Sequence, residues 1–284
     1  MQNKITIYDL LEAKRSGKKF SAISCYDYTT AIFAAQAGVD MLLVGDSAAQ
    51  AMLGFDSTLP ATMDFMVAIT AAVRRGAPGV CLAADMPFLS YQTGIKDAIK
   101  NAGRFVVEAG ADIIKIEVSD AYTDVVKAVS DAGMAVMAHI GIKPQSIGKT
   151  GKFRADATTA EIAVELISLA DRMTAAGASM LLVEGAAAEA AAIVTDTVTI
   201  PVIGCGSGAA CDGNILIAPD ILGLTTRPMP KFAKSYGDSA KEFVRLFRAY
   251  RDEVKSGRFP DSEHSYHMKS GEIERLKAML DGLK

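Results

Sequence analysis

Short apolar runs that each end in an acidic residue recur four times in this chain, and they constrain its fold more than any other feature. The runs and the residues that close them are 41–45 before Asp46, 80–84 before Asp85, 113–116 before Glu117 and 180–183 before Glu184. Runs of this kind are typical of strands buried on both faces of a parallel sheet. If helices separate these strands, the four carboxylates meet at the carboxyl end of a closed barrel, where (β/α)8 proteins carry their active sites.

Strand and helix patterns alternate along most of the chain. Further strands are expected at 20–25, 135–139, 201–206 and 220–224. Helices are expected at 7–15, 28–37, 63–75, 95–109, 122–132, 160–176 and 187–194. Eight such repeats predict an α/β fold, a (β/α)8 TIM barrel with additional C-terminal helices. An open, doubly wound sheet is the alternative.

The domain organisation follows from the same pattern. Residues 1–284 are predicted to form a single barrel domain, with 238–284 as a C-terminal helical extension. In this extension 238–255 and 271–284 are amphipathic, and 256–270 is a polar connection. A length of 284 residues suits one α/β barrel better than two average domains.

Composition excludes several classes of function. The formal net charge is −3 and the pI is about 5.7, so no basic surface for nucleic acid is expected. No apolar run reaches the roughly 18–20 residues that span a bilayer, and the first residues lack the apolar stretch of a secretory signal. The four cysteines form no CxxC pair and are expected to be buried free thiols: Cys25, Cys81, Cys205 and Cys211. We therefore expect a cytoplasmic protein without nucleic-acid or membrane partners.

Three of the strand-end carboxylates suggest a site for a hard cation. Asp46, Asp85 and Glu117 close consecutive expected strands and offer the oxygen ligands that Mg²⁺ prefers. Thiolate or multiple histidine ligands, which zinc prefers, are not available at these strand ends. A single carboxylate in this position more often caps the following helix. The joint occurrence on successive strands is what favours a metal site.

Three other strand residues are candidates for the same site. Lys115 lies two residues before Glu117 and shares its face of the strand, so it is either an anion anchor or part of an ion-pair network. His139 ends the fifth strand, where a histidine is more often a core residue than a catalyst. Glu184 is a candidate base on the side of the barrel away from the metal. His264 and His267, by contrast, are expected to be solvated or to lie at the edge of a lid.

The glycine-rich stretch 204–208 closes the expected seventh strand. Such stretches bind phosphate in many barrels, because their backbone N–H groups are free to face an anion. They also allow tight turns and close approach of neighbouring groups. The sequence leaves these alternatives open.

A set of motifs in the expected order resembles the ketopantoate hydroxymethyltransferase family. The motifs are Val44-Gly45-Asp46-Ser47, Asp56-Ser57-Thr58-Leu59-Pro60, 71–78, Ala84-Asp85-Met86-Pro87-Phe88, Lys115-Ile116-Glu117, Ala138-His139-Ile140-Gly141, Pro144-Gln145-Ser146, Val183-Glu184, Pro230-Lys231-Phe232-Ala233-Lys234 and His264-Ser265-Tyr266-His267. They cover roughly residues 5–267, which makes the resemblance far more specific than any single motif.

The resemblance implies a (β/α)8 barrel of the phosphoenolpyruvate/pyruvate superfamily that depends on Mg²⁺. It also implies transfer of a hydroxymethyl group from 5,10-methylenetetrahydrofolate to 3-methyl-2-oxobutanoate, giving 2-dehydropantoate in pantothenate and coenzyme A synthesis. The family forms large homo-oligomers, typically decamers, so a homo-oligomer is expected.

The resemblance also implies roles for individual residues. Asp46 and Asp85 would bind Mg²⁺ and the substrate chelated to it, with Glu117 in the metal shell directly or through water. Ser47 and Lys115 would hold the 2-oxoacid carboxylate, and His139 would lie near the substrate oxygens. Glu184 would accept the proton.

Three loops depart from the family pattern: 48–50, 146–158 and 225–227. They are expected near the barrel mouth, where they could change the 2-oxoacid or the one-carbon donor. A paralogue acting on another 2-oxoacid is therefore an alternative, as is a superfamily C–C or C–P lyase or aldolase that works through a Mg²⁺-stabilised enolate. Residues 87–91 lack the catalytic cysteine that such lyases usually carry, which counts against a lyase. A non-catalytic barrel is disfavoured because Asp46, Asp85 and Glu184 are all present.

Overall fold

The computed structural model describes residues 4–151 and 155–283. The chain divides into two compact units, Met1–Tyr236 and Gly237–Lys284. The first unit contains the barrel and the candidate site, and the second contains the last two helices.

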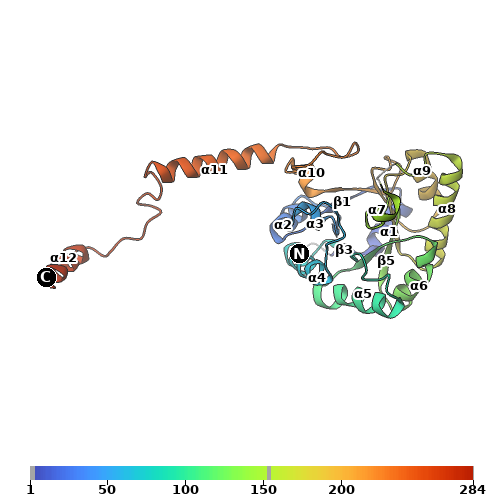
Figure 1. The fold of residues 1–284 in the computed structure, drawn as a ribbon, viewed down its shortest axis with the longest axis horizontal. Coiled ribbons are helices and arrows are strands. Elements are labelled where there is room, and N and C mark those ends of the chain that lie inside the picture. The colour runs from blue at the N-terminus through green and yellow to red at the C-terminus, as the bar shows by residue number, and fades with distance from the viewer. Residues whose placement is uncertain (1–3, 152–154, 284) are drawn as a thin grey trace. The chain divides into compact units, whose positions relative to one another are not determined.

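Eight parallel strands close the barrel of the first unit in their order along the chain (Figure 1). They are β1 (Phe20–Ser24), β2 (Met41–Val44), β3 (Cys81–Asp85), β4 (Ile113–Glu117), β5 (Ala135–Gly141), β6 (Met180–Glu184), β7 (Val202–Cys205) and β8 (Gly213–Ile217). β8 pairs with β1 from Phe20↔Gly213 to Ser24↔Ile217, and this pairing closes the sheet. The predicted TIM barrel is confirmed, and the open doubly wound sheet is excluded.

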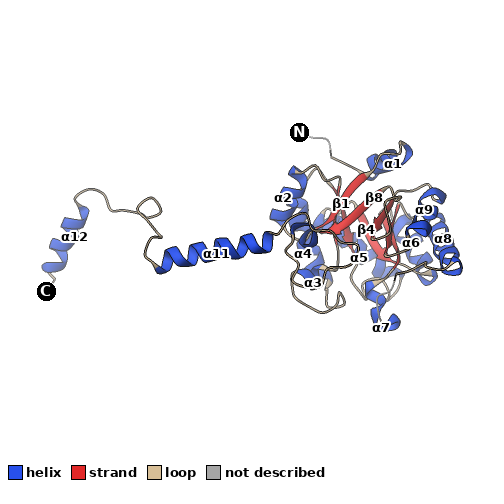
Figure 2. Ribbon diagram, turned by 90° about the horizontal axis from the view of Figure 1, so that it is seen from above, coloured by secondary structure: helices blue, strands red, loops and turns tan. Residues whose placement is uncertain are grey.

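Helices surround the barrel (Figure 2). Those of the first unit are α1 (Ile7–Arg15), α2 (Tyr28–Gln36), α3 (Ala48–Ala51), α4 (Met63–Gly76), α5 (Ile95–Ala109), η1 (Asp120–Tyr122), α6 (Thr123–Asp131), η2 (Pro144–Ser146), α7 (Ile147–Thr150), α8 (Ala160–Ala175), α9 (Ala188–Thr197) and α10 (Ala218–Leu222). Local sequence fixes many of their ends. Thr6 and Asp9 form a capping box at the start of α1, and Gly110 ends α5 at φ 69°.

Strand side chains alternate between two cores. One set fills the barrel interior, including Met41, Ile113 and Met137, together with Leu10 of α1. The other set packs between the strands and the surrounding helices, including Leu42 and Ile114. Because side chains alternate with a period of two, a polar residue at every second position of a mostly apolar strand faces the barrel interior.

The two ends of the barrel differ in what covers them. Figure 2 shows α1 at one end, and α3 and α7 at the other. The loops that carry α3 and α7 follow β2 and β5, so they lie at the carboxyl end of the strands. The candidate site lies at the carboxyl end. At the amino end, Leu10 packs into the interior core.

The eighth strand was predicted in the wrong place. We expected it at 220–224, but β8 spans Gly213–Ile217 and the following residues form α10, Ala218–Leu222. Gly213 and Asn214 interrupt the apolar character of the true strand. Pro219 in the first turn and Gly223, in the left-handed conformation at φ 67°, fit a short helix. The short elements α3, η1, η2 and α7 were not predicted.

The second unit contains α11 (Ser239–Lys255) and α12 (Glu272–Asp281), close to the helices expected from the sequence. Large apolar side chains on α11 are exposed, including Phe243, Phe247 and Tyr250. That residues 238–284 extend a single barrel domain stays a prediction. No helix within the described ranges is both long and apolar enough to cross a membrane.

Candidate active site

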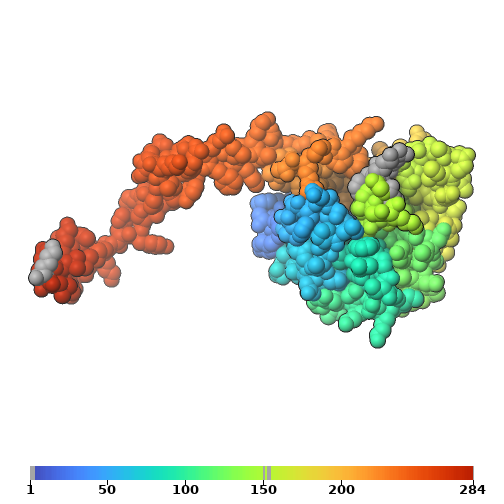
Figure 3. All heavy atoms as spheres, in the orientation of Figure 1, coloured from blue at the N-terminus to red at the C-terminus, as the bar shows by residue number. Residues whose placement is uncertain are grey.

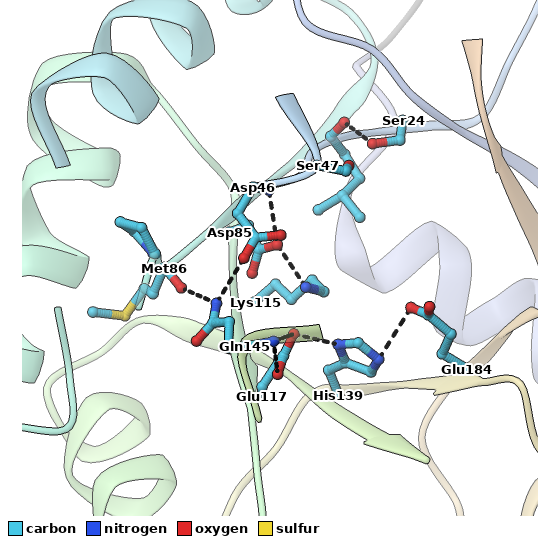
Figure 4. Close-up of polar contacts among 12 residues, drawn as sticks. Ser24, Asp46, Ser47, Asp85, Met86, Lys115, Glu117, His139, Gln145 and Glu184 are labelled. Carbon is cyan, nitrogen blue, oxygen red and sulfur yellow. Dashed lines mark hydrogen bonds and ion pairs between the residues drawn. The ribbon is translucent and has the colours of Figure 1, made fainter. Parts of the chain in front are cut away.

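The carboxyl end of the barrel brings the predicted site residues together (Figure 4). Asp85, Glu117, His139 and Glu184 each continue the alternating, inward-facing set of their own strand. Adjacent strands are in register so that Asp85 lies opposite Lys115, and Glu117 lies opposite His139. A period of two and a regular parallel register are therefore enough to gather these side chains at one level.

Asp46 reaches the site in a different way. It lies two residues after Val44, the last residue of β2, and Gly45 occupies the inward position before it. A Cβ atom on Gly45 would lie 3.0 Å from Ser47 Oγ and 3.2 Å from Ser24 Oγ, so this position is crowded. Ser47 Oγ is 2.8 Å from the hydroxyl of Tyr26. The chain turns here and places Asp46 beside Asp85 of β3 and Ser47 beside Tyr26, which follows β1.

Asp85 is the centre of a buried polar network. Lys115 Nζ donates to its Oδ2 atom at 2.6 Å, and the backbone N–H of Asp46 donates to the same oxygen at 3.1 Å. The side chains of Lys115 and Asp85 are only 6% and 1% exposed. The ion pair is thus shielded from solvent. Removal of either partner of a buried ion pair strongly lowers the free energy of unfolding, because the other charge stays buried and unpaired.

The carboxylates of Asp46 and Asp85 each have one oxygen held by the protein. Oδ2 of Asp46 accepts a hydrogen bond from Gln145 Nε2 at 3.0 Å, and Oδ2 of Asp85 is held as described above. Oδ1 of Asp85 is buried without a hydrogen-bonding partner among the described residues. An unpaired buried carboxylate oxygen next to a second carboxylate fits a hard cation, since such a ligand would replace the missing partner.

The described residues do not form a complete protein cage for a metal. No group of three or more His, Cys, Asp or Glu side chains in those ranges is arranged to hold one. Two carboxylates with room for water and substrate are what Mg²⁺ commonly uses, whereas structural zinc needs four protein ligands. The pair Asp46 and Asp85 therefore fits Mg²⁺, and the place of Glu117 in the metal shell stays a prediction.

Glu117 is held by a residue that the sequence did not single out as functional. The backbone N–H of Gln145 lies 3.3 and 3.1 Å from the two carboxylate oxygens of Glu117. The same residue donates its side-chain amide to Asp46 and to the backbone carbonyl of Met86. Gln145 was part of a family motif, but nothing in the sequence connected it to the carboxylates.

His139 lies between Glu117 and Glu184. Its Nδ1 atom is 3.8 Å from Glu117 Oε1, and its Nε2 atom is 3.3 Å from Glu184 Oε2. Neither ring nitrogen has a hydrogen-bonding partner within the described residues. The imidazole therefore separates the metal side from Glu184, whose side chain is 23% exposed.

Burial controls the protonation of this network. Burial raises the pKa of Asp85 to about 7, although Lys115 opposes this effect. Burial likewise raises the pKa of Glu117 well above its ordinary value. Burial, together with the charge of Lys115, lowers the pKa of His139 and favours a neutral imidazole. For Lys115, burial lowers the pKa, but the surrounding carboxylates outweigh it, so the net shift is upward and the ammonium stays charged.

A cavity of about 430 Å³ at the barrel mouth is lined by Asp46, Ser47, Asp85, Lys115, His139 and Glu184. Residues from several loops complete its wall: Gln50, Thr58, Ile142, Pro144, Pro230 and Phe232. Figure 3 shows the corresponding blue, yellow-green and orange surfaces gathered on one face of the barrel unit. The volume is in the range of small-molecule sites, and the wall is mostly apolar around a few charged groups.

The glycine-rich stretch after β7 serves close packing. A Cβ atom on Gly206 would lie 2.5 Å from the Phe232 ring, and one on Gly208 would lie 2.6 Å from Ala188 Cβ. Both glycines have positive φ, at 69° and 84°. Of the interpretations left open by the sequence, close approach accounts for these contacts, with Phe232 packed against Gly206.

The loops that depart from the family pattern lie in different settings. Gln50 from 48–50 lines the cavity and donates to Asp56 O at 3.0 Å. Arg227 donates to the carbonyl oxygens of Gly54 and Phe55, so 225–227 braces the loop after α3. In 146–158, residues 152–154 lie outside the described residues.

Other predicted residues are not at the site or stay at its edge. The four cysteines are free, as expected; three are buried and Cys205, which lines the cavity, is partly exposed. His264 and His267 lie in the second unit. His264 is within 2.6 Å of Asp261 Oδ1, and both histidines are exposed.

The fold and site define an enzyme of the (β/α)8 class, with buried carboxylates, a lysine and a neutral histidine around one mouth. The family model described as ketopantoate hydroxymethyltransferase matches residues 4–262. This chain belongs to that family.

Curated relatives match over nearly their whole length. Three of them, each named 3-methyl-2-oxobutanoate hydroxymethyltransferase, illustrate this match. The protein from Moorella thermoacetica is 41% identical, covering 93% of this chain and 98% of the relative. The protein from Syntrophobacter fumaroxidans is 40% identical, covering 99% of both chains. The protein from Cenarchaeum symbiosum is 44% identical, covering 92% of this chain and 99% of the relative.

Solved structures support the fold. One is 2,3-dimethylmalate lyase, a member of the PEP mutase/isocitrate lyase superfamily, with a TM-score of 0.58 and 17% identity over 98% of this chain and 96% of that one. Another is a phosphonopyruvate hydrolase complex with oxalate and Mg²⁺, with a TM-score of 0.58 and 14% identity over 96% of this chain and 98% of that one. At these identities the likeness concerns the fold alone.

Proposed function

We propose that this protein transfers a hydroxymethyl group from 5,10-methylenetetrahydrofolate to 3-methyl-2-oxobutanoate and produces 2-dehydropantoate. The names of full-length relatives near 40% identity support the reaction. The observation that carries the proposal is the layout of one cavity. It has a cation-type pair, Asp46 and Asp85, on one side of His139 and a carboxylate base, Glu184, on the other.

Asp46 and Asp85 would hold Mg²⁺ through the carboxylate oxygens that the protein leaves free, with Glu117 acting directly or through water. When bound, Mg²⁺ supplies a Lewis acid for the 2-oxo group. The unpaired Oδ1 atom of Asp85 supports this assignment, because a buried carboxylate oxygen without a partner is costly in the absence of a ligand.

The remaining polar groups would orient the substrate. Lys115 carries the positive charge in this part of the cavity and would attract the 2-oxoacid carboxylate, with Ser47 donating a hydrogen bond from the adjacent turn. His139 is neutral because burial lowers its pKa. It would therefore act toward the substrate oxygens as a hydrogen-bonding group and not as a competing cation.

Glu184 would remove the proton from C3 of the 2-oxoacid. The carbanion equivalent would then form a C–C bond with the one-carbon unit of the donor, and both C–N bonds to that unit would break. Water would supply the hydroxyl oxygen and one proton, and solvent a second proton, so that both released nitrogens leave as N–H groups of tetrahydrofolate. The C3 proton passes to Glu184 and then to solvent. Leu182, Ile142 and Phe232 contribute apolar wall to the cavity, which limits water around the reacting carbon.

Several finer points belong to the same proposal. We infer a cytoplasmic homo-oligomer, a decamer as in the family, without nucleic-acid or membrane partners. A paralogue that uses another 2-oxoacid or another one-carbon donor is the second candidate. The observation that favours it is that Gln50, in a loop that departs from the family pattern, lines the cavity.

The test is a direct assay with Mg²⁺, 5,10-methylenetetrahydrofolate and a panel of 2-oxoacids, with the products identified by mass spectrometry. We expect 2-dehydropantoate from 3-methyl-2-oxobutanoate, and no product when EDTA removes the metal. Turnover of a different acid with none of 3-methyl-2-oxobutanoate would establish the paralogue. Full activity in EDTA would contradict the role of Mg²⁺.

A further inference from the structure

Gln145 is a buried side chain, 4% exposed, whose polar atoms all contact the site network. Its Nε2 atom donates to Asp46 Oδ2 at 3.0 Å and to Met86 O at 2.9 Å. Its Oε1 atom accepts from the Tyr91 hydroxyl at 2.8 Å. Both amide hydrogens and the amide oxygen therefore have partners, as Figure 4 shows for the bonds to Asp46 and Met86.

These partners allow only one orientation of the amide. If the group were rotated by half a turn, its oxygen would face Asp46 Oδ2 and the carbonyl of Met86, which are both acceptors. The single proton of the Tyr91 hydroxyl is shared between Gln145 Oε1 and the carbonyl oxygen of Glu117 at 3.0 Å, and Gln92 Nε2 is a second donor to Oε1 at 3.4 Å. The donor end of Gln145 is thus directed at Asp46 before any ligand binds.

The backbone of Gln145 acts on the second carboxylate. Gln145 lies in η2, directly after Pro144, and its N–H is within 3.3 Å of both oxygens of Glu117. One residue therefore holds Asp46 through its side chain and Glu117 through its main chain. Two buried carboxylates in one site repel each other, so donors between them stabilise the arrangement.

The consequence concerns which oxygen Asp46 offers to the cavity. The hydrogen bond from Gln145 occupies Oδ2, and Asp46 N in turn donates to Asp85. The carboxylate then has a fixed rotation, with Oδ1 left for a cation. Ligands oriented in this way bind metals more tightly, and loss of the orienting group typically weakens metal affinity or activity about 10–100-fold.

We propose that Gln145 is a positioning residue of the cation site, which fixes Asp46 and Glu117 in the arrangement that accepts Mg²⁺. This inference deepens the proposed function and rests on its Mg²⁺ site. Gln145 does not touch the reacting atoms in this account. It acts through Asp46 and Glu117.

The test compares Mg²⁺ binding by isothermal titration calorimetry in the wild type and in Gln145→Met. Methionine keeps the volume but removes both donors to Asp46 and Met86. We expect the dissociation constant for Mg²⁺ to rise about 10–100-fold, and the Mg²⁺ concentration for half-maximal turnover to rise in parallel. A dissociation constant within twofold of the wild type would overturn the proposal.

A matched control separates positioning from a general loss of stability. Asn101 also has a side-chain amide that donates to a backbone carbonyl, Ser90 O at 2.6 Å, but it contacts none of the site carboxylates. Asn101→Leu should lower the melting temperature without changing the Mg²⁺ dissociation constant. An equal loss of Mg²⁺ affinity in Asn101→Leu and Gln145→Met would assign the effect to stability and overturn the proposal.

A second variant keeps the test decisive if Gln145→Met does not fold. Tyr91→Phe removes the hydroxyl that fixes the amide oxygen but leaves both amide donors in place. The Mg²⁺ dissociation constant of Tyr91→Phe should lie above that of the wild type and below that of Gln145→Met. If Gln145→Met does not fold, an unchanged dissociation constant in Tyr91→Phe would overturn the proposal.

The outcomes also separate this inference from the proposed function. A wild type that binds Mg²⁺ but does not convert 3-methyl-2-oxobutanoate would contradict the proposed substrate alone, and the Gln145 comparison would still decide the inference. A wild type that binds no Mg²⁺ would overturn both.

Discussion

Lys115→Met tests the electrostatics of the site most sharply. Lys115 and Asp85 form a buried ion pair at 2.6 Å. In the wild type, burial raises the pKa of Asp85 and Lys115 opposes that rise, with a net value of about 7. Methionine fills a similar volume without charge. The pKa of Asp85 must then rise further, so that at pH 7 the carboxyl group becomes protonated.

The size of the stability change follows from this protonation. Breaking a buried ion pair usually costs about 3–5 kcal/mol, because one charge stays buried and unpaired. Here Asp85 can take up a proton at pH 7 at almost no cost, since its pKa already lies near that pH. The free energy of unfolding at pH 7 is therefore expected to fall by the value of one charge-assisted hydrogen bond, about 1.5–3 kcal/mol. The loss should grow as the pH rises from 7 to 9.

Mg²⁺ binding provides the more specific measurement. A protonated Asp85 must release its proton to bind a cation, so the Mg²⁺ affinity of Lys115→Met should rise about tenfold per pH unit between pH 7 and 9. The wild type should be nearly flat above pH 8. Titration calorimetry with Mg²⁺ at pH 7, 8 and 9 gives both profiles, and urea unfolding at the same pH values gives the stability.

Lys143→Met is the control for Lys115→Met. Lys143 follows β5, but its Nζ atom donates to the carbonyl oxygen of Gly141 at 3.2 Å and forms no ion pair with a carboxylate in the described part of the chain. This variant should follow the wild-type pH profile for Mg²⁺. If Lys115→Met also follows the wild-type profile, with the same affinity at each pH, the reasoning about Asp85 is refuted.

Two further predictions concern the backbone and the metal-free protein. Gly141 has a φ of 88°, and Gly141→Ala would place a Cβ atom 2.3 Å from the backbone oxygen of Glu184. Both the free energy of unfolding, measured with urea, and kcat, measured from initial rates, should fall. An unchanged kcat would contradict this. For Asp85, the folded pKa of about 7 lies above the ordinary value of 3.8, so the folded state holds more protons between these pH values and loses stability as the pH rises. In EDTA, unfolding free energies at pH 5, 6 and 7 should fall more steeply with pH in the wild type than in Asp85→Asn, by up to about 1.4 kcal/mol per pH unit; parallel slopes would contradict the assignment.

Much of the site could be predicted because its residues obey strand periodicity. Asp85, Glu117 and Glu184 end their strands, and the alternation of side chains fixes their inward direction. His139 also faces inward, although β5 continues to Gly141, two residues beyond its expected end. A closed parallel sheet then brings them to one level. The prediction needed only the strand pattern and the number of repeats.

The parts that could not be predicted depend on irregular loops or on distant partners. Gln145 and Asp46 are 99 residues apart, and their contact exists only because η2 folds over the mouth. Thr58, also at the cavity wall, comes from a loop without periodic pattern. β8 was misplaced because Gly213 and Asn214 dilute its apolar signal, while the apolar residues after it belong to a helix. Periodicity carries no information at such positions.

The central claim is that Asp46 and Asp85 hold the cation while Glu184 removes the C3 proton. Proton NMR can follow exchange of that proton for deuterium in 3-methyl-2-oxobutanoate, in D₂O with Mg²⁺ and without folate. The wild type should exchange it, and Glu184→Gln should not, while titration calorimetry shows that the variant still binds Mg²⁺ and the 2-oxoacid. Exchange at a near-normal rate in Glu184→Gln would contradict the account.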